Sequence, residues 1–212
     1  MWSSQNRMNQ IIPISCQIDW NSTWLYLNNN HKRTYNYTNF QLSHSKSFRI
    51  KNIINSLPTI HKLHYLYPHI YNTINCISCN SHEHSLHWVI CPNTIPYYTI
   101  LSQTILQTIP HLLPDLSNHE LLELQQKLLN HPCLSPTSQT PNNQLNFYHS
   151  IRGFIPKLII NTILVYTGSN KTASNITIKL LLKLSHNLYE QVWKPYCTNL
   201  ANWKKYITSL AK

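Results

Sequence analysis

The sequence predicts a mainly α-helical fold, a small helical bundle interrupted by one cysteine-rich loop-helix insert. Apolar residues recur at helical spacing in several segments between residues 19 and 193. The chain has only two glycines, Gly153 and Gly168, and prolines stand at the ends of the periodic segments. Alternating apolar and polar runs, which mark strands, are few. We therefore expect helices packed around a core that 212 residues are enough to bury.

Composition divides the chain into four parts. Residues 1–18 show no periodicity and are expected to be loosely ordered, whereas residues 19–131 form a helical region. Residues 132–146 are rich in Pro, Ser, Thr, Gln and Asn, which indicates a linker. Residues 147–212 form a C-terminal helical segment.

Two helices are predicted in the first third of the chain. Residues 19–27 place three apolar side chains on one face, where we expect them to be core: Trp20, Trp24 and Leu27. Residues 45–56, which Ser45 can cap, carry a longer apolar stripe: Phe48, Ile50, Ile53, Ile54 and Leu57. Arg49 and Lys51 lie off that stripe, as residues that contact solvent or phosphate should.

Prolines and caps set the bounds of the middle helices. Pro58 suits the start of a helix through residue 67, and Pro110 is expected to end a helix over 96–109. The sequence Ser-Asn-His-Glu at 117–120 is a capping box before the apolar residues of 121–128.

The last two predicted helices are the most apolar. Residues 156–167 end at Gly168, a good left-handed terminator. Residues 172–193 carry a leucine stripe and are expected to end at Pro195. The stripe serves either the core or a partner helix, and it includes Leu181, Leu184 and Leu188.

One stretch carries chemistry, a C-x2-C-x7-H-x3-C motif made of Cys76, Cys79, His87 and Cys91. Two thiolates separated by two residues can bind one metal ion from a tight turn. His87 and Cys91, four apart, would lie on one face of a helical turn. Three cysteines and one histidine form a closed tetrahedral set, so we expect structural Zn²⁺. His82 or His84 are alternatives to His87 as the fourth ligand, but they lack its spacing from Cys91. If the motif binds no metal, the cysteines are buried thiols of a helical core.

The formal net charge of +11 favours a polyanionic partner, and RNA or DNA is the expected one. Basic residues concentrate in 31–64 and 152–212. The expected contacts to nucleic acid are Lys46, Arg49, Lys51, Lys204 and Lys205. A solvated basic surface without a ligand is the alternative.

Several protein classes are not expected from this sequence. The zincin motif H-E-x-x-H is not matched, since His82-Glu83 is followed by histidines at 84 and 87. None of the six acidic residues forms the paired cluster that two-metal phosphoryl transfer needs. The first sixteen residues hold no apolar signal segment, and no apolar run approaches the ~18 residues of a membrane span. We expect no enzyme activity, no membrane contact and an intracellular location, in the nucleus or cytoplasm, rather than secretion.

The cysteine motif, with Trp88 directly after the histidine, resembles the zinc-binding region C-terminal to the reverse transcriptase of non-long-terminal-repeat retrotransposons. Residues 47–51 and 57–59 are similar to what precedes that region in retroelement-derived reading frames of A/T-rich fungal genomes. The resemblance spans roughly residues 20–100, with a weaker echo at 193–195. It implies a zinc-stabilised helical module that helps a polymerase hold its template. The polymerase palm and its paired aspartates are absent, so the chain would be a non-polymerising remnant.

Three interpretations of the protein's role follow from these observations. The first is a non-catalytic zinc module that contacts RNA or DNA through basic surfaces. The second is a protein-interaction domain in which zinc holds helices together and the leucine stripe of 172–193 meets a partner. The third is a retroelement remnant without present function.

Overall fold

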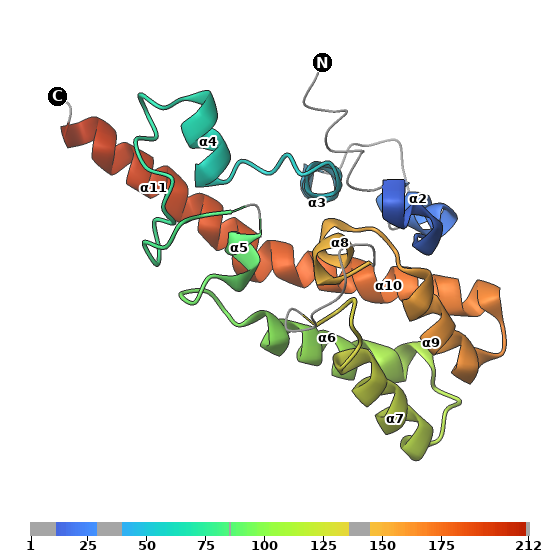
Figure 1. Cartoon of the computed structure of the whole chain (residues 1–212). Coiled ribbons are helices and arrows are strands. Elements are labelled where there is room, and N and C mark those ends of the chain that lie inside the picture. Colours follow the sequence, from blue (N-terminus) through green and yellow to red (C-terminus); the bar gives the residue numbers. More distant parts are fainter. Residues whose placement is uncertain (1–11, 29–39, 85, 136–144, 211–212) are drawn as a thin grey trace.

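The computed structural model describes residues 12–28, 40–84, 86–135 and 145–210, and helices dominate these ranges (Figure 1). In chain order the elements are η1 (Ile12–Gln17), α2 (Trp20–Asn28), α3 (Phe40–Ile53), α4 (Ile60–Leu66), α5 (His87–Ile90), α6 (Tyr97–Leu112), α7 (Asn118–Leu129), α8 (Phe147–Arg152), α9 (Lys157–Thr167), α10 (Asn170–Leu188), η2 (Tyr189–Trp193) and α11 (Lys194–Leu210). Within the described ranges β-structure is limited to two isolated bridges. The prediction of a mainly α-helical fold is confirmed.

The longest feature is a helical rod made of α10, η2 and α11, which runs across the molecule (Figure 1). Pro195 was expected to end this helix, and that prediction is wrong. The π-helical turn η2 shifts the hydrogen-bond register, so that the Lys194 N–H donates to the carbonyl of Tyr189, five residues earlier. Pro195 then stands in the first turn of α11, where a missing N–H is tolerated.

The core lies where α10 packs against α2, α6 and α9, with α7 between α6 and α9. The fully buried side chains there include Ile100, Ile105, Leu124, Leu128 and Ile159. Leu181, Leu184 and Leu188 are also at most 4% exposed. The leucine stripe is therefore core, and it does not form the partner surface that one of the predicted functions requires.

The two helical regions expected on either side of a linker share this core. Leu145 and Cys133, at the two ends of that linker, are buried, and residues 136–144 lie outside the described ranges. At the other end, Ile14 and Ile18 are each 1% exposed. The expectation of a loose segment over 1–18 is thus wrong for 12–18, and residues 1–11 are not described.

The face that α2 buries differs from the predicted one. Trp20 and Trp24 are 47% and 66% exposed, whereas Tyr26 is buried. The reason lies in a neighbouring segment: the Thr23 hydroxyl accepts a hydrogen bond from the Ile155 N–H at 3.0 Å, which turns the polar side of α2 inward. Gly153, with φ of 103°, admits the Tyr26 ring, because a Cβ there would lie 2.8 Å from Tyr26 Cε1.

Helix ends that depend on residues close in the sequence were predicted more accurately than the buried faces of the helices. The capping box is present, with the Glu120 N–H donating to Ser117 Oγ and the Ser117 N–H donating to the Glu120 carboxylate. Helix α9 ends at Gly168, which is left-handed with φ of 62°. Helix α6, in contrast, continues past Pro110 to Leu112.

None of the helices within the described ranges has the length and apolar character needed to cross a bilayer.

Candidate metal centre

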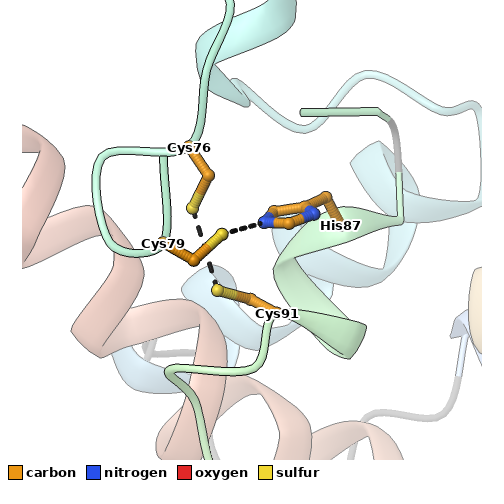
Figure 2. A group of neighbouring side chains, drawn as sticks. All are labelled: Cys76, Cys79, His87 and Cys91. Atoms are coloured by element: carbon orange, nitrogen blue, oxygen red, sulfur yellow. Dashed lines mark hydrogen bonds between the residues drawn. The ribbon is translucent and has the colours of Figure 1, made fainter. Parts of the chain in front are cut away.

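Four side chains converge between α4 and α6: Cys76, Cys79, His87 and Cys91 (Figure 2). Their ligand atoms all lie within 4.8 Å of one another. The Sγ atoms of Cys76 and Cys91 are 3.8 Å apart, and Cys79 Sγ is 3.1 Å from His87 Nε2. Tetrahedral zinc with Zn–S bonds of about 2.3 Å separates two sulfurs by about 3.8 Å, so these four residues can hold such an ion with little movement.

A tight turn places the first two cysteines. The Cys76 N–H donates to the Ser81 carbonyl and the Asn80 N–H to the Cys76 carbonyl, each at 2.8 Å. Asn80 has φ of 60°, a conformation that asparagine tolerates better than most residues. Residues 75 and 82 close the turn as a β-bridge. Both thiols are therefore presented from one compact loop.

The one-turn helix α5 places the other two ligands. His87 begins this helix and Cys91 follows its last residue, so both face the loop of Cys76. Thr94 then bonds the Cys91 carbonyl through its N–H at 3.0 Å and its hydroxyl at 2.8 Å, which ends the helix. His87 is thus the histidine of the group.

The two alternative histidines lie outside the group. His82 and His84 are exposed, and the Nδ1 atom of His84 accepts from the Leu86 N–H at 3.4 Å. The ring of His82 lies 6.0 Å from the ring of His61 on α4. The spacing argument that favoured His87 over both therefore matches the geometry.

The protonation of the site follows from burial and hydrogen bonding. Burial lowers the pKa of His87, and the neighbouring His84 and His82 lower it further, which favours the neutral imidazole that binds metal. Burial raises the pKa of the Cys91 thiol to about 12. Burial also raises the pKa of Cys79, but hydrogen bonds with Ser81, Cys91 and Cys76 outweigh it, so the net shift is downward. Cys79 therefore ionises more readily than Cys91.

Trp88 and Val89 anchor the site to the core, with each side chain 1% exposed. The Trp88 ring lies 5.8 Å from the Phe48 ring on α3 and 5.4 Å from the Trp193 ring in η2. Because these residues adjoin His87, the ligand helix α5 is attached to the middle of the long rod.

Glu83 is the residue that sequence reasoning missed. Its side chain is 0% exposed, and its Oε1 accepts from the Ile60 N–H and from the Tyr196 hydroxyl, both at 2.8 Å. The carboxylate therefore caps α4, where the Thr59 side chain forms no cap, and joins the loop to α11. Burial raises the pKa of Glu83, and hydrogen bonds from Tyr196 and the α4 backbone offset only part of that rise. The signal in the sequence was a rare acidic residue placed between Cys79 and His87 in a strongly basic chain.

The predicted phosphate contacts do not all lie at the surface. Lys51, Lys204 and Lys205 are exposed and Lys46 is half-buried, but Arg49 is only 9% exposed. The Arg49 guanidinium carbon lies 5.7 Å from the centre of the Tyr26 ring, because this side of α3 packs on α2. The expectation that Arg49 contacts phosphate is therefore corrected, since its side chain has a structural position between two helices.

Comparison with known proteins adds no relative to this picture. The chain matches no protein-family model, no curated protein and no solved structure. The metal centre and the charged surface must therefore be interpreted from their own geometry.

Proposed function

We propose that the protein is a non-catalytic zinc-binding module that contacts RNA or DNA through its basic surfaces. The observation that carries the proposal is the convergence of three sulfurs and one imidazole nitrogen within 4.8 Å. Thiolate and imidazole donors suit Zn²⁺, and four protein ligands leave no position for a reacting water. A role in holding the loop therefore fits better than catalysis.

The charge distribution supports a nucleic-acid partner. The sequence contains no acidic residue in 20–82 or in 191–212. These two segments pack together, since the Phe48 ring lies 6.0 Å from the Trp193 ring. Burial raises the pKa of the Cys197 thiol, and the positive charge of Lys51 partly offsets that rise, so Lys51 on α3 lies near Cys197 on α11. The exposed Lys51 on α3 and the exposed Lys204 and Lys205 on α11 thus add positive charge to surfaces that attract phosphate.

The proposal extends to origin and location. The Cys3His motif with its buried tryptophan supports descent from the zinc-binding region of a retrotransposon reverse transcriptase. Cysteine ligands remain reduced in the nucleus or cytoplasm, which supports an intracellular site of action.

Metal content is the first measurement. The parent protein and its Cys79→Ser variant are purified without added metal, and zinc per chain is measured by mass spectrometry. We expect about one zinc in the parent and none in the variant. A folded parent without zinc would overturn the metal assignment.

Nucleic-acid binding is then followed across a salt series. The affinity should fall linearly on a double-logarithmic plot, because the contacts are to phosphate. The absence of binding at low salt would overturn the nucleic-acid half of the proposal.

A further inference from the structure

Exposed tyrosines gather on two segments that lie far apart in the sequence. Tyr65 and Tyr67, at the end of α4, are 73% and 48% exposed, and Tyr206 in α11 is 60% exposed. Large aromatic side chains with this exposure present about half or more of their surface to a ligand. The core does not require them.

These two segments run side by side (Figure 1). The Ile60 N–H donates to the Tyr196 hydroxyl at 2.9 Å, and the Tyr71 ring stacks on the Trp203 ring at 6.0 Å with an interplanar angle of 19°. Residues 60–71 therefore follow α11 from Tyr196 to Trp203. Tyr206 stands three residues beyond Trp203, a rise of about 4.5 Å along the helix.

The Tyr65 ring is held in place although it is exposed. It meets the His61 ring edge-on at 5.0 Å and the His64 ring at 5.9 Å. His64 is itself fixed, because its Nδ1 lies 2.6 Å from the Tyr71 carbonyl oxygen. A tyrosine positioned in this way loses little conformational freedom when a second ring stacks on it.

The surroundings of these rings are basic. Lys204 and Lys205 are exposed and precede Tyr206 directly. The acid nearest in sequence to α4 is Glu83, whose side chain is fully buried. The face thus combines open aromatic rings with positive charge, and that pairing complements a ligand that has both bases and phosphates.

We propose that this face, formed by α4 and the C-terminal turns of α11, binds single-stranded nucleic acid by stacking bases on Tyr65 and Tyr206. The inference rests on the proposed function and names its ligand. A single strand can turn its bases toward the rings, whereas the bases of a duplex are already stacked on each other. The lysines beside the rings neutralise the backbone of the bound strand.

The metal centre supports this face indirectly. Glu83 lies in the loop between Cys79 and His87, and its carboxylate holds the start of α4 against Tyr196. Loss of the metal should therefore loosen α4 and weaken the binding of single strands.

The test uses the zinc-loaded full chain and two fluorescent probes, oligothymidylate and a duplex of the same length. We expect tighter binding to the single strand. The double variant Tyr65→Ala/Tyr206→Ala removes two stacking rings and should lose about 30-fold or more in affinity for oligothymidylate and little for the duplex. The matched control is Trp24→Ala, which removes an equally exposed aromatic ring from α2 and should change neither affinity.

Replacement of both tyrosines by phenylalanine distinguishes stacking from hydrogen bonding. The phenylalanine variant should keep the parent affinity, because stacking needs the ring and not the hydroxyl. Equal binding of both probes, or equal losses in the alanine and phenylalanine variants, would overturn the stacking inference and leave the proposed function intact. If neither oligothymidylate nor the duplex bound, both the stacking inference and the proposed contact with nucleic acid would be overturned.

Discussion

Two regions of this molecule are stabilised by different forces. The helical half (α6, α7, α9 and α10) consists of long helices whose apolar stripes meet in one core. The cysteine loop (residues 70–95) has one four-residue helix, α5, among its described residues, and it buries polar side chains together with Trp88 and Val89. Glu83 and His87 are buried there beside Cys76 and Cys91.

The difference follows from how each region satisfies its backbone. A helix pairs most of its own N–H and C=O groups, so apolar packing alone can stabilise it. An irregular segment pairs fewer of its own, and side chains or a metal must supply the remaining contacts. The cysteine loop should therefore depend on a few residues, whereas the helical half should depend on many.

The largest effect is expected from removing the metal. In Cys79→Ser, the site loses one of its four ligands, and zinc binding is worth roughly 10–16 kcal/mol in small zinc domains. Residues 70–95 should unravel first, while the helical half keeps its structure. Hydrogen exchange read by mass spectrometry would locate the change, and the control is Cys16→Ser, which replaces an exposed cysteine. Unchanged protection of residues 70–95 in the metal-free variant would contradict a structural role.

The opposite result is expected for a core leucine of the helical half. Leu124 is 0% exposed, so Leu124→Ala should lower the free energy of unfolding by about 2–5 kcal/mol through the cavity it leaves. Zinc content should stay the same as long as the protein is folded. Leu122→Ala on the same helix is the control, because Leu122 is 59% exposed. Thermal unfolding that gave equal losses for the two variants would argue against the packing of α7.

A smaller effect is expected where the two regions meet. Glu83→Ala removes the acceptor of the Tyr196 hydroxyl and one of the two acceptors of the Ile60 N–H, and leaving the buried hydroxyl unpaired should cost about 1–3 kcal/mol. Exchange of the first amides of α4 should increase. Glu83→Gln keeps a carbonyl acceptor and should retain more of the protection. If both variants left α4 as protected as in the parent, Glu83 would not be the link between the loop and α11.

The smallest predicted effect is a dependence of stability on pH that arises in α8, outside both regions. Burial and, to a smaller extent, the charge of Arg152 together lower the pKa of His149 from its ordinary value of 6.5 to about 4. Above pH 6.5 the imidazole is neutral in both the folded and unfolded states, and the folded protein bears no penalty. As the pH falls from 6.5 toward 4, only the unfolded chain takes up the proton, so stability should fall.

The size of this change is about 1–2 kcal/mol, allowing for the partial exposure of His149. Chemical denaturation of the parent and of His149→Gln at several pH values would measure it, and metal release cancels in the difference between them. Parallel pH profiles for the two proteins would show that His149 does not carry the effect.

Features that depend on residues close in the sequence were predictable. The grouping of Cys76, Cys79, His87 and Cys91 was predictable from their spacing, because a C-x2-C turn and an i, i+4 pair are local geometries. The capping box at Ser117 and the left-handed end at Gly168 were predictable for the same reason. The binding of zinc, the nucleic-acid partner of the protein and any relation to reverse transcriptases remain predictions.

The faces of the helices were less predictable, because spacing reveals an apolar stripe but not which neighbour covers it. Ile50 and Ile54 belong to the predicted stripe of α3 and yet are 40% and 49% exposed. Asn52, from the polar side of that helix, is buried and donates to the Ile151 carbonyl. Contact with α8 decided this orientation, and α8 lies about a hundred residues further along the chain.

The sequence by itself determined the helical class, several helix ends and the set of donors that can bind a metal, because these depend on interactions within one or two turns. Only the tertiary structure decided the burial of Arg49, the passage of the rod through Pro195 and the position of Glu83 between α4 and α11. Each of these depends on segments that are distant in sequence, such as Tyr26 for Arg49 and Tyr196 for Glu83. Local patterns specify what a residue can do, and long-range packing selects which partner it meets.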